Sequence, residues 1–235
     1  MMVTIFIQAI KTTSYLNNVI YNTYVNDESA LYNQADVFFN IQAKYAINAS
    51  MMYALALNES GLGLSQYALE YHNLFGHAAI DENPDNANQY KSIADCVQQH
   101  AYNFLQQGYL NPEDSRYHGS WFGDKASGIN VNYASDPYWG EKAASFYYQL
   151  DEDGIDQKKN PIKTIQLSKD LKVYAPNKKD VLYTYKKGSI VSINILKDEH
   201  RYYKISSEAP VKDNHLNVNA KYKNSYAYIK KSDFK

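Results

Sequence analysis

Cysteine is almost absent from this chain, with Cys96 the only one among 235 residues. A lone cysteine excludes an intrachain disulfide. Its position beside Val97 in an apolar helical pattern predicts a small buried hydrophobe and argues against a nucleophilic thiol. Few cysteines are compatible with the cytoplasm and equally with secretion, so this scarcity does not decide the compartment.

Long apolar runs are also missing. No stretch approaches the ~20 apolar residues that a membrane-spanning helix needs, so we expect no transmembrane segment. The first residues, Met1 to Ile7, are too short an apolar stretch for a signal peptide and have no charged segment before them. We therefore expect either that an export signal has been removed or that the protein reaches its substrate by another route.

Signatures of cofactor and nucleic-acid binding are weak or absent. Neither a phosphate-binding loop nor a dinucleotide fingerprint occurs, and we expect no cofactor. His72 and His77 are separated by five positions and a glycine, without a Cys or carboxylate pattern beside them, so no metal site is predicted. Lysines scattered among tyrosines near the end of the chain are a poor basis for nucleic-acid binding, and we expect no such partner.

The net charge of −1 hides opposite charges in the two parts of the chain. Residues 1–150 contain 6 Lys and Arg against 14 Asp and Glu, which is −8, whereas residues 151–235 contain 18 against 11, which is +7. Such a change of sign is typical of two domains with different roles. The basic part is suited to an anionic wall polymer or membrane surface, although lysines that only solubilise a surface give the same pattern.

The first part of the chain has the apolar spacing of helices. We expect helices from Ala30, from a cap at Asn48 or Ser50 to Glu59, from Ser65, from Ser92 to Gly108, and from Asp136-Pro137 onward. Residues 109–132 form a predicted long loop, and such loops inside compact domains are usually functional.

After a charged linker the apolar period changes from 3.6 to 2, which indicates β-strands. We expect strands at residues 172–174, 181–185, 189–193, 202–205 and 226–229, enough for a small barrel. The predicted organisation is a mainly α-helical domain over residues 1–152, a linker over 153–162 and a small all-β barrel over 163–235.

Glu59 stands at the predicted C-terminal end of an apolar helix, just before a break at Gly61 and Gly63. The carbonyl end of a helix has a negative potential, and both this potential and burial disfavour an ionised carboxylate, so we expect a raised pKa. A carboxyl group that keeps its proton near neutral pH suits the general acid of glycosidic bond cleavage. The alternative is a solvated residue at a helix end.

Three motifs occur in order around this residue. Residues 59–65 read Glu-Ser-Gly-Leu-Gly-Leu-Ser, residues 73–76 read Asn-Leu-Phe-Gly, and residues 133–136 read Tyr-Ala-Ser-Asp. Together they resemble the glucosaminidase family of bacterial cell-wall hydrolases, the family 73 glycoside hydrolases, over roughly residues 15–150. The segment after the linker resembles, more weakly, a bacterial SH3-like domain, through its strand spacing and its final Tyr-Ala-Tyr-Ile-Lys pattern.

The resemblance implies a lysozyme-like catalytic lobe that hydrolyses the β-1,4 bond after N-acetylglucosamine in peptidoglycan, followed by an SH3-like barrel that binds wall polymers. It implies a protein secreted to the bacterial wall, or one carried by a phage that acts on the host wall. A lytic transglycosylase or muramidase on the same lobe is one alternative. A non-catalytic wall-binding or phage-tail module is another, although Glu59, Ser60 and Tyr133 argue against a decayed site.

The same resemblance implies roles for individual residues. Glu59 would protonate the leaving oxygen, and Tyr133 would hydrogen-bond in the transition state unless it is a core tyrosine. The second catalytic group stays open: Asp81 is the best candidate, ahead of Glu82 and Asp95, and the substrate's own 2-acetamido group is the other route. The expected substrate-binding residues, among which Phe75 and Trp139 can equally belong to the core, are Ser60, Asn73, Phe75, Gly76, Tyr117, Trp121, Asp136 and Trp139.

Overall fold

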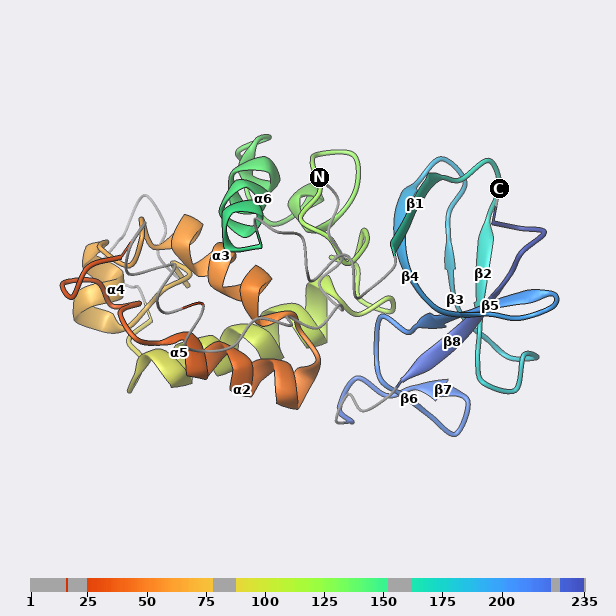
Figure 1. Cartoon of the computed structure of the whole chain (residues 1–235), viewed down its shortest axis with the longest axis horizontal. Coiled ribbons are helices and arrows are strands. Elements are labelled where there is room, and N and C mark those ends of the chain that lie inside the picture. Colours follow the sequence, from red (N-terminus) through yellow and green to blue (C-terminus); the bar gives the residue numbers. More distant parts are fainter. Residues whose placement is uncertain (1–15, 17–24, 78–87, 152–161, 221–224, 235) are drawn as a thin grey trace.

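The computed structural model describes residues 16, 25–77, 88–151, 162–220 and 225–234. Figure 1 shows a helical part, coloured orange to green, beside a part made of β-strands, coloured teal to blue. The change from helices to strands falls after the last helix, α6 (Trp139–Leu150), as the sequence predicts. Most of the predicted linker lies outside the described residues.

Helix α3 (Ala49–Glu59) is the centre of the helical part (Figure 1). Residues 49–57 are all buried, and the helix packs against α6 and against α2 (Ala35–Tyr45). Asn48 caps α3 as predicted, because its side-chain oxygen accepts a hydrogen bond from the N–H of Met51 at 2.9 Å. A helix buried on all sides holds the residue at its end in a defined place.

Helix α2 begins at Ala35 and not at Ala30, so that prediction was wrong. The N–H of Ala30 instead donates to the carbonyl of Gly63 at 3.0 Å, which ties the start of this segment to the turn after α3. This tertiary contact outweighs the local helical pattern. The predicted end of the helix is confirmed, since Ala46 has a left-handed φ of 56°.

Two further helix starts are confirmed by their caps. Ser65 accepts from the N–H of Ala68 at 3.2 Å at the start of α4 (Gln66–Tyr71), and Ser92 accepts from the N–H of Asp95 at 3.1 Å at the start of α5 (Ile93–Gln99). Each serine hydroxyl pairs one of the free N–H groups of a first helical turn.

Helix α5 continues as the π-helix η2 (His100–Tyr109), where the sequence predicts an α-helix to Gly108. Because each N–H of a π-helix donates five residues back, its turns are wider and the buried stripe shifts. Leu105 is therefore fully buried, while Phe104, the predicted stripe residue, is only half-buried. A short 3-10 helix, η3 (Ile129–Val131), and then α6 complete this part.

All five predicted strands are confirmed, as β2 (Leu171–Tyr174), β3 (Val181–Tyr185), β4 (Ile190–Asp198), β5 (Tyr202–Ser206) and β8 (Tyr226–Lys230). Three more strands are not predicted from the sequence: β1 (Ile162–Gln166), β6 (Val211–Lys212) and β7 (His215–Leu216). β6 and β7 have two residues each and so show no alternation, and no residue of β1 is fully buried.

Six strands form one antiparallel sheet in the order β1-β4-β5-β8-β2-β3, and β6 pairs with β7. Among the described residues no pairing joins β1 to β3, so the sheet does not close into the predicted barrel. Its inner face includes Val173, Val191, Ala227 and Ile229, which are fully buried. The coarse prediction of a helical lobe followed by a β part is thus confirmed.

The helical and β parts contact each other along η2 and the loop that follows it. The side chain of Gln106 in η2 donates to the carbonyl of Val218 at 2.7 Å. Trp121, from the loop, belongs to the buried core of the β part. Within the ranges that the structure describes, no helix combines the length and the apolar character needed to cross a membrane.

Candidate active site

Glu59 is the last residue of α3, as the sequence predicts. Ser60 ends the helix, because its buried hydroxyl donates to the carbonyl of Ala56 at 2.5 Å and accepts from the N–H of Gly63 at 2.8 Å. The chain turns here through left-handed conformations at Gly61 and Gly63 (φ 57° and 78°), which favour glycine. Ser60 therefore holds Glu59 in place, and its hydroxyl is already paired within the protein.

The carboxyl of Glu59 is half-buried. Burial raises its pKa, while hydrogen bonds donated by Trp139 Nε1 and, at 3.4 Å, by Asn58 Nδ2 lower it, with a net rise. Burial is the largest effect because removal of water penalises the ionised form most. Glu59 can therefore keep its proton to a higher pH than an exposed glutamate, as a general acid requires.

Trp139 opens α6 and donates its indole N–H to Glu59. Its side chain is only 4% exposed and meets Phe122 edge-on, with ring centroids 5.8 Å apart. The ring of Trp139 thus belongs largely to the core, the alternative that the sequence left open beside sugar binding. Its contact with the acid suits a role in positioning.

Tyr133 lies beside this pair, with its ring 4.5 Å from that of Trp139 and 5.1 Å from that of Tyr109. Burial raises its pKa well above the usual value, and the negative charge of Glu59 raises it further. The phenol therefore stays protonated and can donate a hydrogen bond close to Glu59. The structure thus brings together three of the predicted site residues: Glu59, Tyr133 and Trp139.

The Asn73–Gly76 motif forms a closed turn. Asn73 is buried, and its amide donates to the carbonyl of His77 at 2.9 Å and accepts from the N–H of His77 at 3.0 Å. Phe75 is also buried and stacks on the imidazole of His100 at 3.8 Å, while Gly76 has a left-handed φ of 62°. Asn73 and Phe75 therefore shape the turn, and we no longer expect their side chains to contact a sugar directly.

Two buried histidines lie in contact under this turn, and the sequence did not predict this contact. His77 Nε2 lies 2.9 Å from His100 Nδ1, and His77 Nδ1 lies 2.5 Å from the hydroxyl of Tyr90. Burial lowers the pKa of His77 to about 4, so the pair is neutral at neutral pH. The helical spacing correctly predicted a packed His100, but no local pattern links residues 77 and 100.

The remaining predicted residues lie elsewhere. Trp121 is fully buried in the β core and cannot stack on a sugar there, so that expectation is corrected. Tyr117 is half-buried against the same core and its hydroxyl donates to Glu208, while contact of its ring with a sugar stays a prediction. Asp136 pairs with Lys142 at 2.7 Å and accepts from the N–H of Tyr138 at 2.9 Å, just before α6. Helix α6 begins at Trp139 and has no side-chain cap, so the predicted helix start at Asp136-Pro137 was wrong.

Asp81 and Glu82 lie outside the described residues. Asp95 is accounted for by the start of α5, where its N–H donates to Ser92. In the described part of the chain, no group of three or more His, Cys, Asp or Glu residues could hold a metal ion.

Residues 35–152 match a family model described as Glucosaminidase, mannosyl-glycoprotein endo-beta-N-acetylglucosaminidase. This match covers half of the chain. The chain belongs to the glucosaminidase family. The matched segment contains Glu59, Trp139 and Tyr133, the three residues that the structure brings together.

Two relatives from Streptococcus pneumoniae, from the serotype 4 strain TIGR4 and the strain R6, are provisionally named endo-beta-N-acetylglucosaminidase. Each is 34% identical over 126 residues, a match that covers 54% of this chain and 18% or 17% of the relative. The chain therefore spans about a sixth of the length of these relatives.

Among solved structures, the chain is similar to Autolysin E of Staphylococcus aureus in complex with the disaccharide NAG-NAM. The identity is 21%, the TM-score is 0.47, and the match covers 64% of this chain and 71% of the other. A likeness this low supports no conclusion about the glucosaminidase site described above.

Proposed function

We propose that this member of the glucosaminidase family hydrolyses the β-1,4 bond between N-acetylglucosamine and N-acetylmuramic acid in peptidoglycan. The observation that carries the proposal is the environment of Glu59: a half-buried carboxyl with a raised pKa, fixed at the end of α3 and held by Trp139. In a family of glycoside hydrolases, such a group has the properties of the general acid.

In the proposed reaction, Glu59 gives its proton to the glycosidic oxygen while the bond between this oxygen and the anomeric carbon breaks. The 2-acetamido oxygen of the substrate attacks the anomeric carbon from the other side, and water then opens this intermediate and returns a proton to Glu59. The phenol of Tyr133 stays protonated beside Glu59 and so can donate a hydrogen bond to the reacting sugar. A second carboxylate, for which Asp81 is the candidate, is the other route to the same product.

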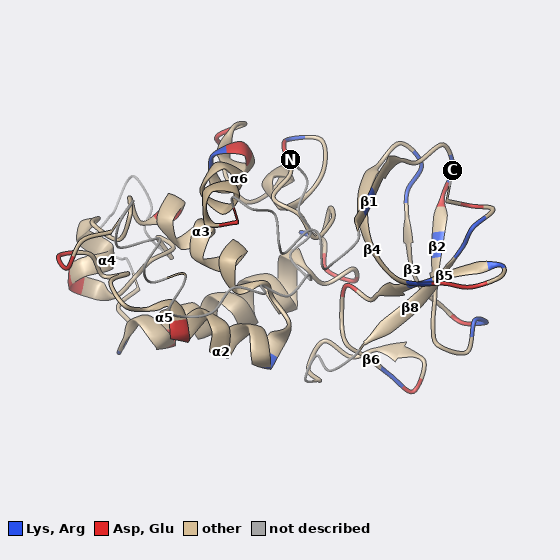
Figure 2. Cartoon of the chain, in the orientation of Figure 1, with Lys and Arg blue, Asp and Glu red and all other residues tan. Residues whose placement is uncertain are grey.

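For the β part we propose an SH3-like module over residues 163–235, after a catalytic domain over 1–152 and a linker over 153–162. Its charge supports binding to anionic wall polymers, since residues 151–235 carry +7. Figure 2 shows Lys and Arg concentrated on the β part and sparse on the helices. A hydrolase of this kind would act at the bacterial wall, either as a secreted protein or as a phage-borne one.

The products of wild-type protein on purified peptidoglycan test this function. After borohydride reduction, mass spectrometry should find fragments that end in reduced N-acetylglucosamine. Anhydromuramyl or reduced muramic ends would contradict the proposal and indicate a lytic transglycosylase or a muramidase. Binding to the wall without any cleavage would also contradict it and indicate a binding module.

A further inference from the structure

Trp121 connects the two parts of the molecule. It comes from the loop after η2, but it is fully buried in the same core as Leu171, Val173 and Ile229 of the β part. A Cβ at Gly119 would overlap the outer edge of its ring, so the loop is also fitted closely to the indole. The indole nitrogen is buried and has no hydrogen-bond partner among the described residues. Apolar packing therefore holds this side chain.

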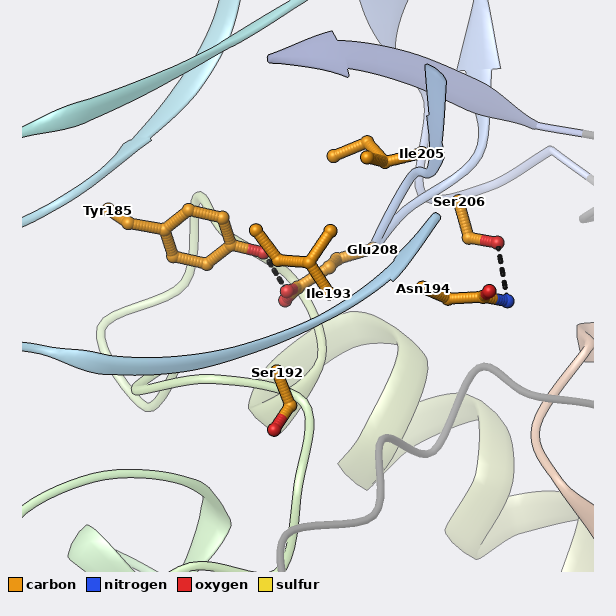
Figure 3. A pocket seen from close by; sticks show the side chains of 7 residues that line it. All are labelled: Tyr185, Ser192, Ile193, Asn194, Ile205, Ser206 and Glu208. Atoms are coloured by element: carbon orange, nitrogen blue, oxygen red, sulfur yellow. Dashed lines mark hydrogen bonds between the residues drawn. The ribbon is translucent and has the colours of Figure 1, made fainter. Parts of the chain in front are cut away.

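Glu208, which follows β5, fixes the start of the same loop. It is 5% exposed and accepts hydrogen bonds from the hydroxyls of Tyr117 in the loop and Tyr185 in β3. Its own N–H donates to the hydroxyl of Tyr183 at 3.3 Å. Figure 3 shows Tyr185 and Glu208 in contact in a small pocket of the β part, which the side chain of Asn194 also lines. A carboxylate shared by both parts joins the loop to the sheet.

The loop connects Trp121 to the candidate acid through two intervening aromatic residues. Phe122, the next residue, packs edge-on against Trp139, which donates to Glu59. The carbonyl of Phe122 accepts from the N–H of Asn130 at 3.0 Å, and the Asn130 amide donates to the carbonyl of Asp136 at 3.0 Å, just before α6.

A close approach of two glycines completes this contact. A Cβ at Gly140, the second residue of α6, would overlap the carbonyl oxygen of Gly123. The backbone of the loop thus lies directly against the start of the helix that carries Trp139. A shift of the loop cannot leave the start of α6 where it is, because close-packed interiors transmit such displacements.

We propose that Trp121 is a positioning residue: its burial in the β part holds residues 121–123 against the start of α6, and this contact sets the place of Trp139 beside Glu59. If the proposed function holds, this positioning makes the β part necessary for catalysis on small soluble substrates, and not only for attachment to the wall. This kinetic consequence rests on the proposed function.

The test compares Trp121→Leu with wild type in the full chain, on a soluble peptidoglycan tetrasaccharide. We expect kcat to fall on the order of tenfold or more with KM nearly unchanged, because the acid is misplaced while the sugar contacts remain. Trp121→Phe, which keeps an aromatic ring in the core, should restore most of kcat. Phe234→Leu is the matched control: it truncates another buried residue of the β core and should leave kcat unchanged.

A second readout does not depend on activity. The chain contains only two tryptophans, so in Trp121→Phe and Trp121→Leu the single indole N–H resonance is that of Trp139. We expect its chemical shift to differ from that of wild type in Trp121→Leu and to move back towards it in Trp121→Phe. If Trp121→Leu does not fold, Glu208→Gln replaces it, with a smaller shift expected.

A wild-type Trp139 resonance in folded Trp121→Leu, or in Glu208→Gln where it replaces that variant, would overturn the inference. A wild-type kcat in folded Trp121→Leu would also overturn it. An equal loss of kcat in Phe234→Leu would also overturn it, because the effect would then be one of general stability. Failure of the proposed function is distinguishable: wild type would be inactive while the Trp139 resonance still responded to Trp121.

Discussion

Glu59 and Glu70 show how the environment of a single residue decides its chemistry. Both are glutamates of neighbouring helices, but Glu70 is exposed on α4 and its carboxylate accepts from Gln66 at 3.2 Å. Glu59 is half-buried at the end of α3 and accepts from the indole of Trp139. Burial raises the pKa of Glu59, which suits a proton donor at neutral pH, and the hydrogen bond from Trp139 limits this rise.

Removal of the indole donor should therefore move the pH range of activity. In Trp139→Phe the hydrogen bond that lowers the pKa of Glu59 is lost, so this pKa rises further. Because the protonated acid is the active form, the alkaline limb of the pH profile of kcat/KM should shift to higher pH. Asn58→Ala, which removes the 3.4 Å donor, should shift it in the same direction by less. An unchanged limb, or a shift to lower pH, would contradict this account of Glu59.

At the scale of elements, much of the structure could be predicted from the sequence. The helix starts at Asn48 (with Ser50 as the alternative cap), Ser65 and Ser92 and the five longer strands were predicted, because these signals are local and periodic. The wide turns of η2 were not, since the apolar spacing over residues 93–104 is that of an ordinary α-helix.

Candidate site residues could be predicted where each lies in a recognisable local motif. The prediction was wrong where a side chain packs against residues that are distant in the sequence. Glu59 and Tyr133 were identified from their own motifs and lie together. The loop carrying Trp121 reads as part of a groove, yet its partners, the core of the β sheet and Glu208, lie beyond the linker. No local pattern reports which of two cores a tryptophan will enter.

At the scale of the whole molecule, two buried groups give stability opposite dependences on pH. Burial lowers the pKa of His77 from 6.5 to about 4. Between these two pH values the unfolded chain binds a proton that the folded chain does not, so stability is lost as pH falls from 6.5 to about 4. Burial raises the pKa of Glu208 from 4.5 to about 7, so stability is lost as pH rises through that window. Each difference corresponds to about 3 kcal/mol, and in wild type the two largely offset each other.

Substitution of either group should leave the pH dependence of stability that the other group causes. Relative to wild type, the free energy of unfolding of Glu208→Gln should increase as pH rises from about 4.5 to 7, and that of His77→Gln should decrease over a similar range. Urea unfolding at several pH values measures both slopes. His200→Gln, at an exposed position, serves as the control and should run parallel to wild type. Parallel curves for all three variants would contradict these assignments.

The most direct test of the central claim, that Glu59 is the general acid, is the rate of peptidoglycan cleavage by Glu59→Gln beside Glu70→Gln. Both changes replace a glutamate by its amide of the same shape, but only the first removes the half-buried proton donor. We expect Glu59→Gln to lose on the order of a hundredfold or more in kcat with its melting temperature maintained, and Glu70→Gln to match wild type. Wild-type turnover by folded Glu59→Gln would contradict the account and require a different acid.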